Sequence, residues 1–243
     1  MTWNPDQYHK FQAQRSAPFD DLLKLVDLGC GTGELTRRLA DSLPESLVLG
    51  LDSSPQMLAQ AEAVKRPGLT FELGDQAGLS GEWDLIFSNA ALQWSENHEQ
   101  LIGHLHARLA KGGQIAVQVP SNHNHSSHRL IIETAQEESF RAILGGFVRY
   151  SPVLSLSDYA QLLFDLGAED IIVFEKVYAH ILENSDAVVE WVSGTALVPY
   201  FERLGEHKTA FLDVLRDKFR AAMPGQPVFY PFKRTLFSAR KPR

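Results

Sequence analysis

Three glycines on alternate positions restrict what this chain can fold into more than any other feature of its sequence. The stretch Leu25–Gly33 reads LVDLGCGTG, an apolar run followed by Gly29, Gly31 and Gly33, and helical spacing of leucines begins at Leu35. A glycine-rich turn between a strand and a helix exposes backbone N–H groups and removes side chains where a ligand approaches closely. The stretch therefore predicts a strand, a bare ligand-binding loop and a helix.

Strand-like and helix-like segments continue to alternate from residue 25 to residue 119. This alternation predicts an α/β fold with a parallel sheet built from right-handed crossovers. The short, nearly continuous apolar runs are typical of strands covered on both faces. The predicted strands are 25–28, 46–52, 69–73, 83–89 and 113–119, and the predicted helices between them are 33–43, 54–64 and 98–110.

The regular alternation of strands and helices ends after Pro120. A polar, histidine-rich loop there leads into helical segments, a strand at 170–179, a helical stretch at 185–223 and a closing strand. We expect a single domain in four parts. These are an N-terminal helical lid at 1–24, a cofactor-binding core at 25–119, cap helices with the sixth strand at 120–228, and a last strand at 229–243.

The join between the lid and the first strand is abrupt. An apolar helical stripe that includes Leu22 and Leu23 must end, and the strand must begin, within a few residues. Either this linker is unusually tight or residues are absent from the sequence here, and the second interpretation is favoured.

Composition excludes several classes of protein. The net charge of −7 disfavours a general affinity for nucleic acid or an anionic membrane, because both ligands need a basic face. The single cysteine, Cys30, rules out an internal disulfide and a thiolate zinc site, and is typical of a reducing compartment. There is no apolar signal core and no run of roughly 18 apolar residues. We expect a cytoplasmic protein, a monomer or a weak homodimer, without a metal.

The spacing of the glycines narrows the choice of ligand. The string from Gly29 to Gly33 reads G-x-G-x-G after Asp27, whereas the dinucleotide fingerprint is G-x-G-x-x-G. A phosphate-binding P-loop is excluded because no G-K-[ST] follows. Asp52 ends the next strand about 20 residues further on, where an acidic residue accepts hydrogen bonds from ribose hydroxyls. These features alone remain compatible with NAD.

Residues at the ends of the third and fourth strands favour a smaller adenosine-bearing cofactor. Asp75 follows the third strand and is placed to accept a hydrogen bond from an adenine amino group. The fourth strand delivers Asn89, Ala90, Gln93 and Trp94 to the carboxyl edge of the sheet, where open α/β sheets bind ligands.

Taken in order over residues 25–119, these motifs resemble the class I S-adenosylmethionine-dependent methyltransferases. The resemblance implies a Rossmann-like fold, with a mostly parallel seven-stranded sheet, an antiparallel last strand, helices on both faces and a helical cap. It implies S-adenosyl-L-methionine as cofactor and S-adenosyl-L-homocysteine as product. The residues expected at the cofactor are Tyr8, Arg15, Asp27, Gly29, Gly31, Gly33, Asp52, Ser53, Met57, Asp75, Gln76, Asn89, Ala90 and Trp94.

A narrower resemblance extends over nearly the whole chain. The segments WNPDQYHKFQAQRSAP, NAALQW, VQVPSN, EWVSGTALVPYFERL and PFKRTLFSARK are similar to those of trans-aconitate 2-methyltransferases, which form a methyl ester on a carboxylate. The run after the fifth strand departs from the family's usual MPDN, because Ser121 stands at its third position.

A carboxylate acceptor is ionised at neutral pH, so no general base is expected and the chain needs only to position its substrate. Cationic side chains would hold the other carboxylates of a small polyanionic acid. Candidates are Gln93, His123, Arg149 and Arg234, together with Arg15 and His128.

Three alternatives stay open. The acceptor could be another small molecule or an acyl group on a carrier protein. The chain could be an NAD-dependent oxidoreductase, or it could bind the cofactor without catalysis. Single residues could also have purely structural roles. Asp52 could cap the following helix, Asp75 could be an ordinary loop acid and Cys30 could be a small spacer in the loop.

Overall fold

The computed structural model of the chain describes residues 23–243. Tyr8, Arg15 and nearly all of the predicted lid lie outside this range. None of the helices between residues 23 and 243 has the length and apolar character needed to cross a bilayer.

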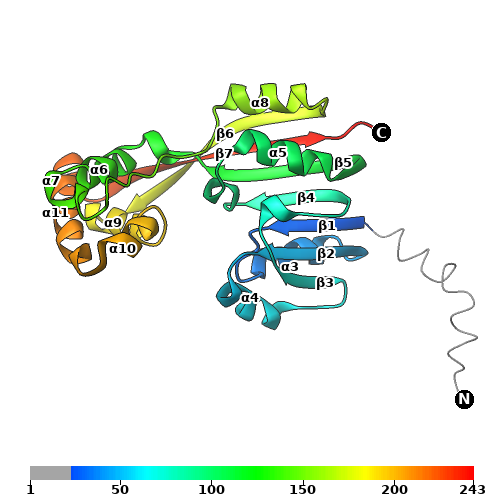
Figure 1. The fold of residues 1–243 in the computed structure, drawn as a ribbon, viewed down its shortest axis with the longest axis horizontal. Helices are drawn as coiled ribbons and strands as arrows, with labels where there is room; N and C mark the ends of the chain where they lie inside the picture. Colours follow the sequence, from blue (N-terminus) through cyan, green and yellow to red (C-terminus); the bar gives the residue numbers. More distant parts are fainter. Residues whose placement is uncertain (1–22) are drawn as a thin grey trace, which may run out of the picture. The chain divides into compact units, whose positions relative to one another are not determined.

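The strands of the structure form one seven-stranded sheet in the order β3-β2-β1-β4-β5-β7-β6 (Figure 1). β1 pairs in parallel with β2 and β4, and β5 pairs in parallel with β4. β7 is antiparallel to its neighbours β5 and β6, so the predicted mostly parallel sheet with an antiparallel last strand is confirmed. The strands are β1 (Leu23–Leu28), β2 (Ser46–Asp52), β3 (Leu69–Leu73), β4 (Trp83–Asn89), β5 (Leu109–Pro120), β6 (Glu169–Leu182) and β7 (Val228–Arg240).

The helices fall between the strands as the alternation predicts, with several added after β5. The first half contains α3 (Glu34–Ser42), α4 (Pro55–Ala61), η1 (Glu62–Val64), η2 (Gln76–Gly78), η3 (Leu92–Trp94) and α5 (His98–Ala107). The second half contains η4 (Asn122–Asn124), α6 (Ser126–Ala135), α7 (Glu138–Arg141), α8 (Leu156–Asp165), α9 (Ser185–Ser193), α10 (Val198–Leu204), η5 (Gly205–His207) and α11 (Lys208–Ala222).

Local sequence explains where several of these helices begin. At α4, the Ser54 side chain accepts a hydrogen bond from the Met57 N–H at 3.3 Å, and Pro55 takes the first helical position. Asn97 adopts a left-handed conformation and its side chain accepts from the Gln100 N–H at the start of α5. Short side-chain acceptors thus satisfy N–H groups that have no partner inside the helix.

Two predicted boundaries are wrong, both because pairing between distant segments overrides local pattern. Leu23, predicted at the end of a helix, is the first residue of β1 and pairs with Ser46. The predicted helix 98–110 ends at Ala107, and the strand predicted at 113–119 begins earlier, because β5 starts at Leu109. There, Gly113 accepts a hydrogen bond from the Lys241 N–H, a partner that no local pattern reveals.

The chain forms two compact units. Unit 1 contains the described residues up to Gln118, together with Leu154–Val173 and Phe237–Arg243, and unit 2 contains Val119–Val153 and Phe174–Leu236. The core of unit 1 includes Leu25, Val48 and Leu69 from the parallel strands. That of unit 2 gathers side chains of α6, α9, α10 and α11, which lie together in Figure 1.

Candidate functional site

Two of the three loop glycines are required by packing within unit 1. Gly29 has φ +72°, and a Cβ there would lie 2.1 Å from the Ala91 Cβ. Gly33 has φ +80°, and a Cβ there would lie 2.7 Å from the Phe71 ring. Side chains are therefore excluded at both positions by steric overlap, in addition to the strain that an L-residue has in this conformation.

Gly31 differs from its neighbours, because its missing side chain leaves open space. Its φ is +57°, and a Cβ built there meets no atom of the described residues within 4 Å. Its N–H donates a hydrogen bond to Asp52 Oδ2 at 2.8 Å. The open side of Gly31 is the part of the loop that a ligand can approach without displacing protein atoms.

Asp52 connects the glycine loop to the start of α4. One carboxylate oxygen accepts from the Gly31 N–H, and the other accepts from the Ser54 N–H at 2.9 Å. A carboxylate offers about four lone-pair sites, so both oxygens can still accept from a ligand hydroxyl. Met57, in the first turn of α4, is 44% exposed. The N-cap of α4 is Ser54, so the alternative in which Asp52 itself caps this helix is wrong, and the ribose contact of Asp52 stays a prediction.

Asp27 is buried beneath the loop rather than exposed on it. It is 3% exposed, and the Thr36 hydroxyl donates to its Oδ2 at 2.6 Å. Burial raises the pKa of Asp27 to about 6, against the lowering effect of the Thr36 hydrogen bond, and the charge of Asp52 adds a smaller rise. Burial also raises the pKa of the Cys30 thiol to about 12. A thiol held in its protonated form is a poor nucleophile, which supports the spacer interpretation.

The segments after β3 and β4 present the remaining predicted cofactor residues. Asp75 Oδ1 accepts from the Ala77 N–H at 2.7 Å, which caps η2, and the Gln76 side chain donates to the Ser95 hydroxyl. Ala90 has φ +57°, and its N–H donates to the Gln118 carbonyl at 2.9 Å.

The turn η3 follows directly. The Gln93 side chain donates to the Ala90 carbonyl at 2.6 Å, and Trp94 is 47% exposed. Asn89, as the last residue of β4, stands at the carboxyl edge of the sheet.

Of the predicted substrate residues that the structure describes, all except Gln93 belong to unit 2. The Arg234 guanidinium lies 5.0 Å from the Phe232 ring centroid and 5.7 Å from that of Tyr178. Burial lowers the pKa of Arg234. The backbone N–H of Arg149 donates to the Tyr200 hydroxyl at 3.0 Å.

His123 stands beside an ion pair that sequence reasoning missed. Lys233 Nζ lies 2.8 Å from Glu175 Oε1, and the Ser121 hydroxyl donates to Glu175 Oε2 at 3.2 Å. Burial lowers the pKa of His123, the charge of Glu175 opposes this, and Lys233 adds to it. The position of Lys233 next to Arg234 in FKRTLF was the signal available in the sequence. Nothing in the sequence indicated Glu175, which comes from a different strand.

Hydrogen bonds join the side chains of the histidine-rich loop. The Ser127 hydroxyl lies 2.9 Å from His125 Nδ1, 3.2 Å from His128 Nδ1 and 3.2 Å from the Tyr230 hydroxyl. Burial, with His125 and His123 nearby, lowers the pKa of His128 to about 4. Within residues 23–243, no group of three or more His, Cys, Asp or Glu side chains is arranged to hold a metal ion.

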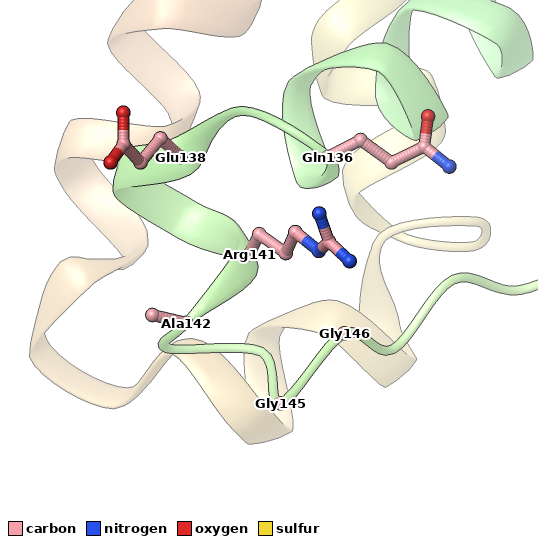
Figure 2. Close-up of a pocket in the computed structure, with 6 residues that line it drawn as sticks. All are labelled: Gln136, Glu138, Arg141, Ala142, Gly145 and Gly146. Carbon is pink, nitrogen blue, oxygen red and sulfur yellow. The ribbon is translucent and has the colours of Figure 1, made fainter.

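A separate pocket of about 680 Å³ lies in unit 2 around α7 (Figure 2). In Figure 2, the Arg141 side chain extends toward the space between Gln136 and Gly146, whereas Glu138 points to the other side. None of the residues predicted for the cofactor or the substrate lines this pocket. Its lining residues are Gln136, Glu138, Arg141, Ala142, Gly145 and Gly146.

Comparison with solved structures agrees with the fold. Over 96% of this chain and 99% of the other, the structure is similar to a putative methyltransferase from Bacillus halodurans, with a TM-score of 0.57 and 16% identity. It is also similar to phosphoethanolamine N-methyltransferase 2 of Haemonchus contortus in complex with S-adenosyl-L-methionine. That match has a TM-score of 0.54 and 19% identity, over 98% of this chain and 53% of the other. At these identities the likeness concerns the fold alone.

Sequence comparison goes further. Residues 26–115 match the family model described as a methyltransferase domain. The chain is 52% identical to trans-aconitate 2-methyltransferase of Deinococcus radiodurans, over 100% of this chain and 99% of the relative. It is 38% identical to that of Methylobacterium nodulans, over 99% of both. The first alignment spans 258 positions and this chain has 243 residues, so some positions of the relative have no counterpart here. The chain belongs to the trans-aconitate 2-methyltransferase family.

Proposed function

We propose that this chain transfers the methyl group of S-adenosyl-L-methionine to a carboxylate of trans-aconitate, giving a methyl ester and S-adenosyl-L-homocysteine. The observation that carries the proposal is the 52% identity over the full chain with the Deinococcus radiodurans enzyme of that name. Unit 1 supplies the glycine loop, and unit 2 supplies half-buried cationic side chains such as Arg149 and Arg234.

The residues of unit 1 fit the proposed cofactor. Among residues 23–243, no atom lies within 4 Å of a Cβ built at Gly31, and Asp52 keeps lone pairs that can accept from ribose hydroxyls. Trp94 offers an exposed ring, and Asp75 keeps carboxylate acceptor sites beyond the one used in capping η2. We assign the cofactor to these residues, with Gly29 and Gly33 shaping the loop and Asp27 supporting it from beneath.

The chemistry demands little from the protein beyond position. When bound, S-adenosyl-L-methionine supplies a methyl group already activated by the positive charge of its sulfonium. The acceptor carboxylate is ionised at neutral pH, so no side chain has to remove a proton. The protein must orient the acceptor and hold its remaining carboxylates, and orientation alone accounts for a large part of such a rate enhancement.

We assign the remaining carboxylates to cationic groups of unit 2, with Arg234 first among them. A guanidinium binds a carboxylate with two parallel hydrogen bonds, and aromatic neighbours such as Phe232 and Tyr178 limit its motion. Arg149, His123, Lys233 and Gln93 are further candidates. We propose a cytoplasmic enzyme that works as a monomer or weak homodimer on a small anionic substrate.

The test is direct. The purified protein is incubated with S-adenosyl-L-methionine and a panel of di- and tricarboxylates, and products are identified by mass spectrometry. We expect a monomethyl ester of trans-aconitate as the main product. Methylation of a different acceptor class with no ester from any polycarboxylate would reject the substrate, and calorimetric binding of NAD in place of S-adenosyl-L-methionine would reject the reaction.

A matched pair of variants tests the substrate residue. R234Q removes the cation and R234K keeps the charge but loses the two-pronged geometry. We expect the KM for trans-aconitate to rise about a hundredfold in R234Q and about tenfold in R234K, with the KM for the methyl donor unchanged. Equal KM values for trans-aconitate in wild type and R234Q would remove Arg234 from the substrate site.

A further inference from the structure

A buried histidine outside the predicted site connects α8 to the turn that carries Gln93 and Trp94. His98, the first residue of α5, is 1% exposed. Its Nε2 lies 2.9 Å from the Leu92 carbonyl oxygen, and its Nδ1 lies 2.5 Å from the Tyr159 hydroxyl. Tyr159, also buried, stacks on Phe237 with 4.7 Å between ring centroids. All four residues belong to unit 1.

The partners of His98 determine its tautomer. The Leu92 carbonyl can only accept, so Nε2 must carry the proton. Burial lowers the pKa of His98, which favours the neutral ring, and Nδ1 of a neutral ring protonated at Nε2 is an acceptor. The Tyr159 hydroxyl therefore donates to Nδ1. The two hydrogen bonds therefore point the same way: Tyr159 donates to His98, and His98 donates to the Leu92 carbonyl of η3.

The receiving carbonyl belongs to the turn at the end of β4. The Leu92 oxygen already accepts from the Ser95 N–H at 2.9 Å, the hydrogen bond that closes η3. His98 adds a second donor to the same oxygen, from a side chain that packing holds in place. Leu92 itself is fully buried, so this end of the turn is fixed while Trp94, two residues later, is exposed.

We infer that His98 is a positioning residue, which through its bond to the Leu92 carbonyl holds η3 so that Gln93 and Trp94 are presented to the bound cofactor and acceptor. The Gln93 side chain also donates a hydrogen bond to the Ala90 carbonyl, which gives the turn a second fixed contact. Tyr159 has an indirect part, since it fixes the orientation of the imidazole. The inference rests on the proposed function, because it assigns the ligands of this turn.

Two substitutions at His98 separate the two hydrogen bonds. The amide nitrogen of H98Q takes the place of Nε2, so it keeps the Leu92 contact and loses that to Tyr159. The amide of H98N takes the place of Nδ1, so it keeps the Tyr159 contact and loses that to Leu92. Each variant loses one buried hydrogen bond, so both should lower the urea midpoint by similar amounts.

Binding of S-adenosyl-L-homocysteine, measured by calorimetry, distinguishes positioning from a purely structural role. We expect H98N to bind about tenfold more weakly than wild type and H98Q to stay within about twofold. Y159F, which keeps the ring stacked on Phe237, should behave like H98Q. If H98N is insoluble, H98L loses both bonds and should show the same tenfold loss.

The outcomes are separable. Equal affinities in H98N and H98Q, with wild type binding normally, would overturn the positioning role and leave the proposed function intact. A wild-type protein that does not bind S-adenosyl-L-homocysteine would overturn the proposed function and the inference together. A tenfold gap between H98N and H98Q at equal urea midpoints would support the inference.

Discussion

The glycine loop of unit 1 and the histidine-rich segment of unit 2 are both polar and both follow a strand, yet they are built differently. In the loop, three positive φ angles and the overlap that a side chain would cause at Gly29 and Gly33 determine the shape of the backbone. Around His128, the side chains of His125, His128 and Tyr230 share hydrogen bonds with the Ser127 hydroxyl. The shape of the first site is set by backbone conformation, and that of the second by side-chain contacts, one of which joins Ser127 to Tyr230, 103 positions away.

The largest expected effect comes from adding one methyl group to the loop. G29A places a Cβ 2.1 Å from that of Ala91 at a φ of +72°, so overpacking and strain add together. We expect a loss of about 3 kcal/mol in the free energy of unfolding, measured by urea denaturation.

G31A is the matched control, because the same strain arises with no atom of the described residues within 4 Å of the new Cβ. It should cost about 1 kcal/mol of stability. Its main effect should instead be on affinity for S-adenosyl-L-homocysteine, reduced at least tenfold because the methyl fills the open side of the loop. Unchanged affinity in G31A would show that the ligand does not approach Gly31.

The two regions should also respond to pH with opposite sign. Asp27 has a pKa raised from 3.8 to about 6, so its folded form binds the proton more tightly. Its contribution to stability is full below pH 4 and is lost as the pH rises through 6, by about 3 kcal/mol. His128 has a pKa lowered from 6.5 to about 4, so the unfolded chain binds the proton more tightly. Its contribution is full above pH 6.5 and is lost as the pH falls to 4, by about 3 kcal/mol.

In the wild type these two dependences largely cancel, so variants are needed to reveal them. As the pH rises from 4 to 6, the stability of D27N relative to wild type should increase. As the pH rises from 4 to 6.5, the stability of H128N relative to wild type should decrease. Urea denaturation at half-unit pH intervals measures both difference curves. Two curves of the same sign would contradict the assigned pKa shifts.

Substitution of Asp52 should weaken cofactor affinity more than substitution of Asp75. D52A removes the acceptor of the Gly31 and Ser54 N–H groups as well as the proposed ribose contact. We expect it to weaken S-adenosyl-L-homocysteine binding by about 1–3 kcal/mol, measured by calorimetry. D75A loses the cap of η2 and should cost less, about 1 kcal/mol in affinity. An unchanged dissociation constant in D52A would remove Asp52 from the cofactor site.

The same comparison explains what could be predicted from sequence. The parallel strands, the loop and Asp52 were predictable because strand alternation, glycine spacing and residue position after a strand are local patterns. The start of β1 at Leu23 and of β5 at Leu109 was not, since partners distant in sequence decide them. Glu175 beside Lys233 and Tyr159 beside His98 were likewise missed, because single sequences carry no signal for contacts across 58 or 61 positions.

The smallest effect is expected at Cys30, a loop residue to whose side chain no steric or ligand-binding role is assigned. The thiol is buried, and its raised pKa of about 12 keeps it protonated throughout the working range. C30A should therefore keep kcat within about twofold and cost about 1 kcal/mol of stability for the lost volume. Iodoacetamide at pH 8 should leave the wild type fully active, because the thiolate is the reactive species. Rapid inactivation that C30A abolishes would show instead that the loop opens to solvent, and that its shape depends on more than its backbone.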